Sequence, residues 1–449
     1  MKRSLALLLA AALLLTLAGC GGKGAEAPAP AETSAPAPAY TPAETPTFDV
    51  TPAASGQVTF LNPDGEAGEM WQELGAGYTA LTGVPVTVTT VAEDYESALA
   101  QALASSDAPT LYCASPASAG EVAAASLDLR DSVVYGELTA ADCVLLDGEG
   151  RVVAVPMALE CRGILVNTAL LSQAGYELDY IDSFSHLRIA ANDIHARAAE
   201  LGFDAFAPVA LEDGMDRYAH DLAGIYPYME LRDAKRGGLD AAVSGKYADD
   251  FQDMWDLLIK DSSVTGAALL KTTVEQSLSE FAGGRAVFML GGDADLAALG
   301  EAGLAGEQLC LLPFYGSLDL EKDAGLSRRG AWYWSVNGGA DEADVAATLD
   351  FLAWVVTSGE GLSALHGVYD YLPYRLAPAP EGLFARQGEA MAAEGKDWLP
   401  AVFPVIPQDG HAALGAGLRR YTNDPSYYNW HSPVLEAARQ EWAACRFVF

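Results

Sequence analysis

The chain has few basic residues for its 449-residue length. It carries 26 Lys and Arg against 61 Asp and Glu, which gives a formal net charge of −35 at pH 7. A surface this acidic argues against binding to nucleic acid or to anionic lipid headgroups, because both repel carboxylates. Acidity spread over a surface otherwise serves mainly solubility, so it defines no function by itself.

The sequence also lacks the common motifs of catalysis and metal binding. It contains no H-E-x-x-H, no G-x-S-x-G, no Walker-type glycine loop and no G-x-G-x-x-G. The six histidines are scattered, with no pair four residues apart. The carboxylates around Asp147 and Glu149 do not have EF-hand spacing. We therefore expect a protein that is not an enzyme and has no cofactor and no metal site.

Long hydrophobic runs are missing except at the start. Leu5–Leu17 follows Lys2 and Arg3 and is too short for a stable membrane span with its flanks. It ends in Leu17-Ala18-Gly19-Cys20, which resembles the lipobox of bacterial lipoproteins. We interpret residues 1–20 as a lipoprotein signal peptide with its lipobox, in which cleavage follows Gly19 and the Cys20 thiol would accept a lipid.

Residues 21–55 consist mainly of Ala, Pro, Glu, Thr and Gly and contain almost no large apolar side chain. Such a segment cannot bury enough surface to offset its ordering entropy, so we expect a disordered linker. The expected localisation is extracytoplasmic, on the outer face of the bacterial cell membrane, with the lipid anchor as the only contact with that membrane.

The five remaining cysteines form no C-x-x-C pair, and most have apolar neighbours. They are Cys113, Cys143, Cys161, Cys310 and Cys445. We interpret them mainly as small buried residues. A disulfide is compatible with the expected compartment, but an odd set cannot be paired from sequence.

From residue 56 onward, short apolar runs alternate with amphipathic runs, which predicts a parallel sheet with helices on its faces. Strands are expected at 57–61, 84–89, 110–113, 206–211, 285–290 and 331–336, with a hairpin over 143–155. Helices are expected at 67–81, 94–103, 168–175, 183–201, 248–260, 273–282 and 342–357, and from Ser432 to about Cys445. Gly83 is expected to end the first helix in a left-handed conformation, Asp94 to cap the second, and Ser432-Pro433 to begin the last.

The order of several segments resembles a known family. After the lipobox and linker, Trp71–Gly83 leads into Val84-Pro85-Val86. Further on come Pro156, Glu160, Val166-Asn167, Leu170-Leu171 and Gly175, and then Phe281-Ala282-Gly283-Gly284-Arg285-Ala286-Val287-Phe288-Met289. In this order the chain resembles the family 1 extracellular solute-binding proteins of ABC importers, relatives of maltose-binding protein.

The resemblance implies an α/β, two-lobe periplasmic-binding-protein-like fold of class II, with mixed sheets flanked by helices and joined by hinge strands. We expect one lobe from 56–162 and 310–372 and the other from 163–309 and 373–449. The stretch Pro156–Asn167 would then be the first crossing between lobes. Taken alone, the same stretch could be an exposed edge strand whose Glu160 and Arg162 are solvated.

Candidate ligand contacts are polar residues that follow strands or lie at the crossing, because ligands of open α/β sheets bind beyond the carboxyl ends of the strands. They are Asn62, Asp64, Ser115, Glu160, Arg162, Asp213 and Asp293. Sugars also need flat aromatic rings against their C–H faces. Trp332, Tyr333, Trp334 and, more weakly, Tyr371 are the candidates, although Trp332 and Trp334 could alternate into the core.

The expected function is capture of a carbohydrate, most simply an oligosaccharide, between the lobes by a monomeric receptor that delivers it to the permease subunits of an ABC importer. Three alternatives stay open. Carboxylates and aromatic rings also suit a cationic ligand such as a polyamine. Two carboxylates could serve a surface glycoside hydrolase. Val166 and Asp293 stand where the family usually has aromatic residues, so the chain could also be a scaffold that has lost its ligand.

Overall fold

The computed structural model describes residues 55–444, apart from 116–117, 216–221, 223, 234–243, 305, 317–322 and 401–407. The expected signal peptide, Cys20, Cys445 and all of the expected linker except residue 55 lie outside the described residues. All of the described residues lie within the unit Pro46–Phe449, and the fold below is that of this unit. Among the helices of the described segments, none combines the length and apolar character that a bilayer span requires.

Ten strands occur in the described residues. They are β1 (Val58–Asn62), β2 (Val86–Thr90), β3 (Leu111–Ala114), β4 (Leu145–Leu146), β5 (Val152–Asn167), β6 (Asp204–Phe206), β7 (Ala286–Gly292), β8 (Leu309–Leu312), β9 (Ala324–Val336) and β10 (Asp397–Pro400).

The helices of the first part of the chain are α1 (Gly68–Thr82), α2 (Tyr95–Leu103), α3 (Ala119–Val122), α4 (Val133–Gly136), α5 (Thr168–Gln173), α6 (Phe184–Ala196), α7 (Ala198–Leu201), α9 (Ile225–Asp233) and α10 (Ala248–Lys260). Those of the second part are α11 (Val274–Ala282), α12 (Leu296–Glu301), α14 (Glu342–Thr357), α15 (Gly359–His366), α16 (Leu383–Ala393), α17 (Gln408–Asn423), α18 (Tyr427–Asn429) and α19 (Leu435–Ala444).

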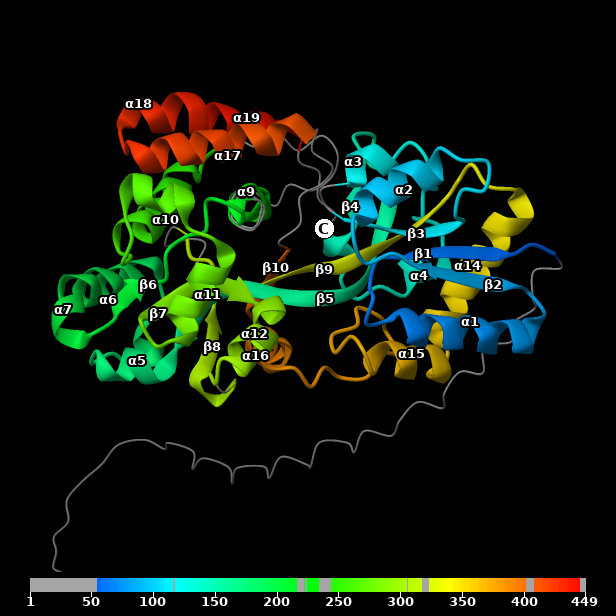
Figure 1. The fold of residues 1–449 in the computed structure, drawn as a ribbon, viewed down its shortest axis with the longest axis horizontal. Coiled ribbons are helices and arrows are strands. Elements are labelled where there is room, and N and C mark those ends of the chain that lie inside the picture. The colour runs from blue at the N-terminus through cyan, green and yellow to red at the C-terminus, as the bar shows by residue number, and fades with distance from the viewer. Residues whose placement is uncertain are drawn as a thin grey trace, which may run out of the picture. The chain divides into compact units, whose positions relative to one another are not determined.

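The strands form one mixed sheet in the order β2-β1-β3-β9-β5-β7-β6, with β10 on β9 and with β4 and β8 on β5. β1 pairs in parallel with β2 and β3, and β6 with β7, whereas β5 is antiparallel to both β9 and β7. Figure 1 shows β5 and β9 running through the middle of the described fold, with helices on either side of the sheet. The expected α/β class with a mixed sheet flanked by helices is confirmed.

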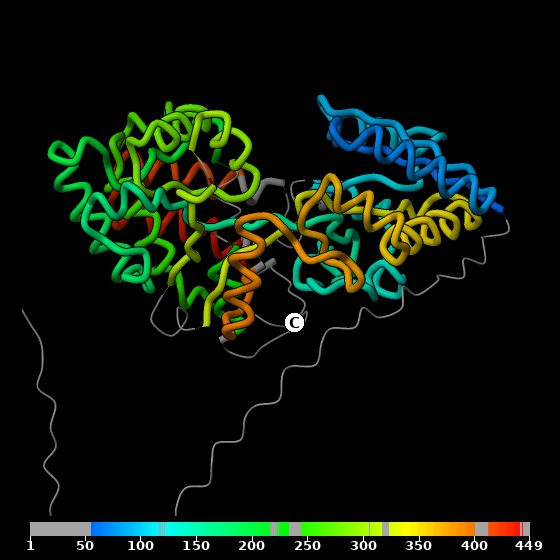
Figure 2. The backbone as a smooth tube through the Cα atoms, turned by 90° about the horizontal axis from the view of Figure 1, so that it is seen from below, coloured from blue at the N-terminus to red at the C-terminus, as the bar shows by residue number. Residues whose placement is uncertain are grey.

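Two of the strands are unusually long. β5 has 16 residues and β9 has 13, against a common length of about 5–6. At roughly 3.3 Å per residue, β5 spans about 50 Å. Helix α16, orange in Figure 2, lies against both strands. Two long paired strands of this kind connect packing regions that short strands could not.

The described residues contain two hydrophobic cores. The first gathers β1, β3, α1, α14 and α15 around side chains such as Trp71 and Trp334. The second gathers α6, α10, α17 and α19 around side chains such as Trp255 and Trp430. The first half of β5 contributes to the first core, and Ile164 belongs to the second. The two-lobe fold follows from this division, and the lobe boundaries stay a prediction.

The stretch Pro156–Asn167 belongs to β5, which is a central strand and not an edge. It lies between β9 and β7, and every residue of β5 except Glu160 is buried. The edge-strand alternative was therefore wrong. Its apolar composition reflects burial on both faces, as in parallel sheets, although β5 itself pairs antiparallel.

Several local predictions are confirmed. Helices α10 and α14 have the expected bounds of 248–260 and 342–357. Gly83 ends α1 at φ 78°, the left-handed conformation that glycine adopts at little cost. The hairpin over 143–155 forms, with Leu145 opposite Ala154 and Leu146 opposite Val152.

Other local predictions were wrong. Asp94 precedes α2 but makes no side-chain capping bond; its φ of 51° is left-handed, whereas a capping residue normally has an extended backbone. The strand expected at 206–211 is shorter and begins earlier, at Asp204–Phe206. Pro433 lies inside a π-helical segment, Trp430–Val434, and the helical run begins earlier, where the Ser426 side chain accepts from the Asn429 N–H.

Candidate functional site

The turn after β1 uses Asn62 and Asp64 to hold the chain. The buried Asn62 amide donates to the Asp64 carbonyl at 2.6 Å and to Thr90 Oγ1 at 3.2 Å. Asp64 Oδ1 accepts from the backbone N–H groups of Glu66 and Ala67 at 2.9 and 3.2 Å. Asn62 thus has the turn chemistry of an Asx residue. Asp64 keeps partial exposure at the carboxyl end of the strand, where its Oδ2 accepts from Tyr369 Oη at 2.8 Å.

The ends of β1 and β3 meet around the ring of Tyr95. Its hydroxyl donates to the Cys113 carbonyl at 2.8 Å and accepts from the Cys113 N–H at 2.9 Å. The ring packs edge-on against Trp332, with centroids 6.1 Å apart. Beyond the end of β3, Ser115 Oγ donates to Glu96 Oε1 at 2.8 Å. Ser115 and Trp332, which are 217 positions apart in the chain, therefore lie near the same tyrosine.

An ion pair joins the two crossing strands. Glu160 lies opposite Arg329 in the β5–β9 ladder, and Arg329 Nε donates to Glu160 Oε1 at 2.5 Å. The side chains are 13 % and 22 % exposed, so the pair is mostly withdrawn from water but keeps access to it. A half-buried carboxylate and guanidinium side by side can bind the hydroxyl groups of a polar ligand from both sides.

A β-bulge places Trp332 on the same face as this ion pair. Trp332 lies opposite Ala158 and Gly330 lies opposite Leu159, so Ala331 is the extra residue of β9. Because Ala158 and Glu160 are two residues apart on β5, their side chains share a face. The bulge puts Trp332 on the same face as Arg329, although residues three positions apart in a regular strand would point to opposite faces.

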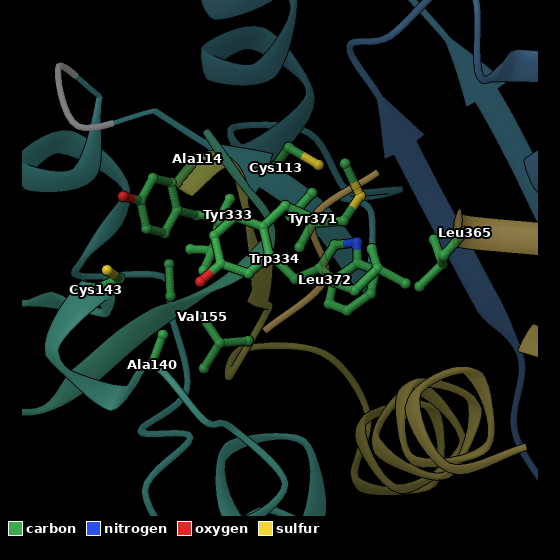
Figure 3. Close-up of a cluster of buried hydrophobic side chains, with 14 of the residues drawn as sticks. Cys113, Ala114, Ala140, Cys143, Val155, Tyr333, Trp334, Leu365, Tyr371 and Leu372 are labelled. Carbon is green, nitrogen blue, oxygen red and sulfur yellow. The ribbon is translucent and has the colours of Figure 1, made fainter. Parts of the chain in front are cut away.

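The tryptophan and tyrosine that follow are core residues. Trp334 is fully buried and packs against Trp71 and Tyr374, with ring centroids 5.8 and 6.1 Å apart. Tyr333 is also fully buried, and its hydroxyl accepts from the Gly330 N–H at 2.8 Å. Figure 3 shows both rings inside a cluster of buried side chains. Of the three adjacent aromatic residues, only Trp332 is partly exposed.

Asp293 lies just beyond the end of β7 and binds the backbone of β5. Its Oδ2 accepts from the Cys161 N–H at 2.6 Å. Burial, and then the negative charges of Glu160 and Asp370, raise the pKa of Asp293 to about 6. Asp293 therefore lies close to Glu160 and acts as an acceptor for the backbone of β5.

Arg162 is buried within the fold. It is 2 % exposed, and its Nη1 lies 3.7 Å from Oδ2 of Asp295, which is 1 % exposed. Asp295 Oδ2 also accepts from the Gly292 N–H at 3.0 Å. Buried charges are stable only when paired, so this interaction fixes the end of β7 against β5. Alternation correctly put Arg162 near Glu160, but burial makes it a structural residue.

Tyr371 belongs to a second polar group, organised by Arg328. Tyr371 Oη donates to Glu389 at 2.7 Å and accepts from Arg328 Nη1 at 3.2 Å, and Arg328 also pairs with Asp142 at 3.3 Å. Since Arg328 and Arg329 are adjacent on β9, their side chains point to opposite faces. Tyr371 is therefore on the face opposite the Glu160–Arg329 pair.

Asp213 lies apart from both groups. Its Oδ1 accepts from the Val274 N–H at 2.8 Å, at the first turn of α11. The same helix start carries a capping box formed by Thr273 and Gln276. Asp213 satisfies one of the unpaired N–H groups of a helix start, which is a structural task.

The structure thus brings Asp64, Ser115, Glu160, Asp293 and Trp332 to the ends of β1 and β3 and to the neighbouring face of the crossing strands. We call these five residues the candidate site. Asn62 supports it from within the turn, whereas Arg162, Asp213, Tyr333, Trp334 and Tyr371 have structural partners elsewhere.

Two residues that contact the candidate site, Tyr95 against Trp332 and Arg329 against Glu160, were not among the candidates that the sequence indicated. Tyr95 falls at helical spacing with Leu99 and Leu103, so it looked like a core residue. Arg329 was recognisable only as part of an Arg-Arg pair, because its place opposite Glu160 depends on strand register.

Two cores joined by long strands, with polar groups gathered where β1, β3 and the crossing strands meet, define the class of two-lobed solute-binding proteins. A family model described as "Bacterial extracellular solute-binding protein" matches residues 73–392, and the chain belongs to that family. A comparison with curated protein sequences gave no significant match.

Solved structures share the fold at low identity. A family 1 extracellular solute-binding protein from Bifidobacterium longum subsp. infantis is 18 % identical with a TM-score of 0.66, over 87 % of this chain and 100 % of that one. RafE from Streptococcus pneumoniae is 14 % identical with a TM-score of 0.62, over 87 % and 98 %. A probable secreted solute-binding lipoprotein from Streptomyces coelicolor is 16 % identical with a TM-score of 0.61, over 87 % and 100 %.

Proposed function

We propose that this extracellular solute-binding protein captures a carbohydrate, most simply an oligosaccharide, at the candidate site and delivers it to an ABC importer. Ligand contacting both lobes would shift an equilibrium between open and closed forms toward the closed one. The permease subunits of the importer would then recognise the closed form. No chemical step is involved.

One observation carries this proposal: Trp332 shares a face with the Glu160–Arg329 pair. A sugar ring has an apolar C–H face and a rim of hydroxyl groups. The indole suits the first, and a carboxylate beside a guanidinium suits the second. Ser115 and Asp64 add polar atoms at the neighbouring strand ends. In support, RafE, a protein with a similar fold, has been solved in complex with raffinose.

We further propose that the chain is held on the outer face of the cell membrane by lipid on Cys20. The Leu17-Ala18-Gly19-Cys20 sequence supports this, as does the naming of the Streptomyces coelicolor protein as a lipoprotein. Expression of the full chain and its Cys20→Ala variant in a bacterial host, followed by detergent phase partitioning, tests it. The wild type should enter the detergent phase and the variant should not.

Isothermal titration of the mature chain with raffinose, galactose, maltotriose and xylotriose tests the ligand class. At least one sugar should bind, and Trp332→Ala should weaken that binding by about tenfold, since an aromatic contact is worth about 0.5–1.5 kcal/mol beyond its area. Tyr180→Ala is the matched control, because Tyr180 is 37 % exposed and lies in the Leu178–Tyr180 turn, among elements of the second core. Its affinity should equal that of the wild type.

A cationic ligand is the second candidate. The charges of Glu160 and Asp370 both act on Asp293, so three carboxylates lie near one another at the site. A polyamine would relieve their repulsion. Tight binding of spermidine without binding of any sugar would replace the first proposal with this one.

A further inference from the structure

A second surface of the protein has the chemistry of a glycan-binding platform. At the corner between α17 and α18, Tyr427 is 76 % exposed and Tyr428 is 65 % exposed. They are adjacent in sequence and are the most exposed large hydrophobic side chains of the described residues. We call these two residues the tyrosine platform. Exposed aromatic surface is unfavourable in water and marks interaction sites when it is clustered.

Both rings have a partner behind them. The Tyr427 ring stacks on His431 one helical turn further on, with centroids 3.8 Å apart and planes 21° apart. The Arg420 guanidinium lies over the Tyr428 ring, 6.0 Å from its centroid. Each tyrosine therefore has one supported face and one face open to a ligand.

The corner itself is tied together by a buried asparagine. Asn429 accepts from Arg420 Nε at 2.9 Å and donates to the Asp424 carbonyl at 2.8 Å and to Asp424 Oδ2 at 3.0 Å. Ser426 caps the start of α18 by accepting from the Asn429 N–H. A platform fixed in this way loses little conformational entropy on binding, which favours affinity.

The rim of the platform is polar and planar. Arg420, Asn423 and Asp424 are exposed around the tyrosines, and His431 is partly exposed. Guanidinium, amide, carboxylate and imidazole groups beside a flat ring are the same combination that suits a sugar in the candidate site. The platform is nevertheless a separate surface, because its elements pack on the second core, whereas Trp332 packs against the first.

Size and charge argue against a protein partner and against an anionic membrane as the ligand of the tyrosine platform. Aromatic side chains bury about 150–250 Å² each, so rings exposed to 76 % and 65 % offer at most about 350 Å². A stable protein interface needs about 800 Å² per partner. An anionic membrane surface would repel a chain of net charge −35. A polysaccharide chain needs only a few ring contacts at a time and carries no charge that the protein would repel.

We propose that the tyrosine platform binds a neutral polysaccharide, separately from the ligand of the candidate site. The extended chain would lie across Tyr427 and Tyr428, with Arg420 and Asn423 in reach of its hydroxyl groups. Such a contact would hold an extracellular receptor near the polymer from which soluble oligosaccharides are released.

Native gel electrophoresis of the mature chain in gels containing soluble starch, xylan, mixed-linkage β-glucan or galactan tests the proposal. The acidic chain migrates toward the anode, and these polymers are uncharged, so retardation measures binding. At least one polymer should retard the wild type. Tyr427→Ala and Tyr428→Ala should each raise the dissociation constant about 2–10-fold, and the double variant should migrate as in a gel without polymer.

Two controls separate the platform from the candidate site and from other occupants. Trp332→Ala should be retarded like the wild type, even where it no longer binds small sugars, and Tyr180→Ala should be retarded as well. Equal retardation of the wild type and the double variant would overturn the proposal, as would a wild type that no polymer retards. Loss of a dimer in the double variant, seen by sedimentation velocity, would assign the platform to a second copy of the chain and would also overturn it.

Discussion

The ion pair between Glu160 and Arg329 offers the sharpest mutational test of the candidate site. Removing one partner of a fully buried pair costs about 3–5 kcal/mol of stability, whereas exposed pairs contribute about 0–1 kcal/mol. The two side chains are 13 % and 22 % exposed, which places the pair between these limits. We therefore expect Glu160→Ala to lower the free energy of unfolding by about 1–3 kcal/mol.

The same substitution should act more strongly on binding. A hydrogen bond from a ligand to a charged group contributes about 1.5–3 kcal/mol, which corresponds to about a 10–150-fold rise in the dissociation constant. Glu160→Gln keeps an acceptor oxygen for Arg329 but removes the charge, so its stability should be closer to that of the wild type while its affinity for the sugar still falls.

Urea denaturation and isothermal titration on the same preparations measure both effects. Glu137→Gln is the matched control, because Glu137 pairs with Arg375 at 3.8 Å on a more exposed surface and lies outside the candidate site. That control should change neither quantity by much. A large stability loss in Glu160→Ala with an unchanged dissociation constant would refute the reasoning and return Glu160 to a structural role.

Two further predictions concern the end of β7. Asp293 has a pKa of about 6 in the folded chain, above the usual value of 3.8, so the folded state binds the extra proton and loses stability as pH rises from about 4 to 6. Asp293→Asn keeps an acceptor for Cys161 N–H and should be more stable than the wild type at pH 7.5 by roughly 2–3 kcal/mol, with equal stability at pH 4 in urea denaturation; a less stable variant at pH 7.5 would contradict this. A Cβ at Gly292 would lie 2.0 Å from the Cys161 carbonyl oxygen, whereas one at Gly300 in α12 would meet nothing within 4 Å. Gly292→Ala should therefore lower the urea midpoint strongly. Gly300→Ala should leave the midpoint unchanged or raise it, with a gain of up to about 1 kcal/mol in the free energy of unfolding.

The fold was largely predictable because its signals are local. The amphipathic pattern of 342–357 and the position of Gly83 gave correct helix bounds and a correct left-handed cap. Errors arose where tertiary packing overrode a local signal. Ser432-Pro433 has the pattern of a helix start, but Pro433 is accommodated inside a π-helical segment of a longer helical run.

The candidate site was predictable only in part, because its geometry depends on strand register. The rule about strand ends found Asp64 and Ser115, and the crossing stretch contained Glu160. Alternation could not reveal that the bulge at Ala331 puts Trp332 on the same face as Arg329, three positions away. Sequence also could not distinguish Arg162, held by Asp295, from Arg329, which faces Glu160.

Small-angle X-ray scattering of the mature chain, with and without the sugar that binds most tightly in titration, tests the central claim most directly. Saturating sugar should lower the radius of gyration of the wild type. Trp332→Ala at the same sugar concentration should show a smaller decrease, because fewer molecules are occupied. A sugar that binds tightly without changing the radius of gyration would contradict capture between two lobes.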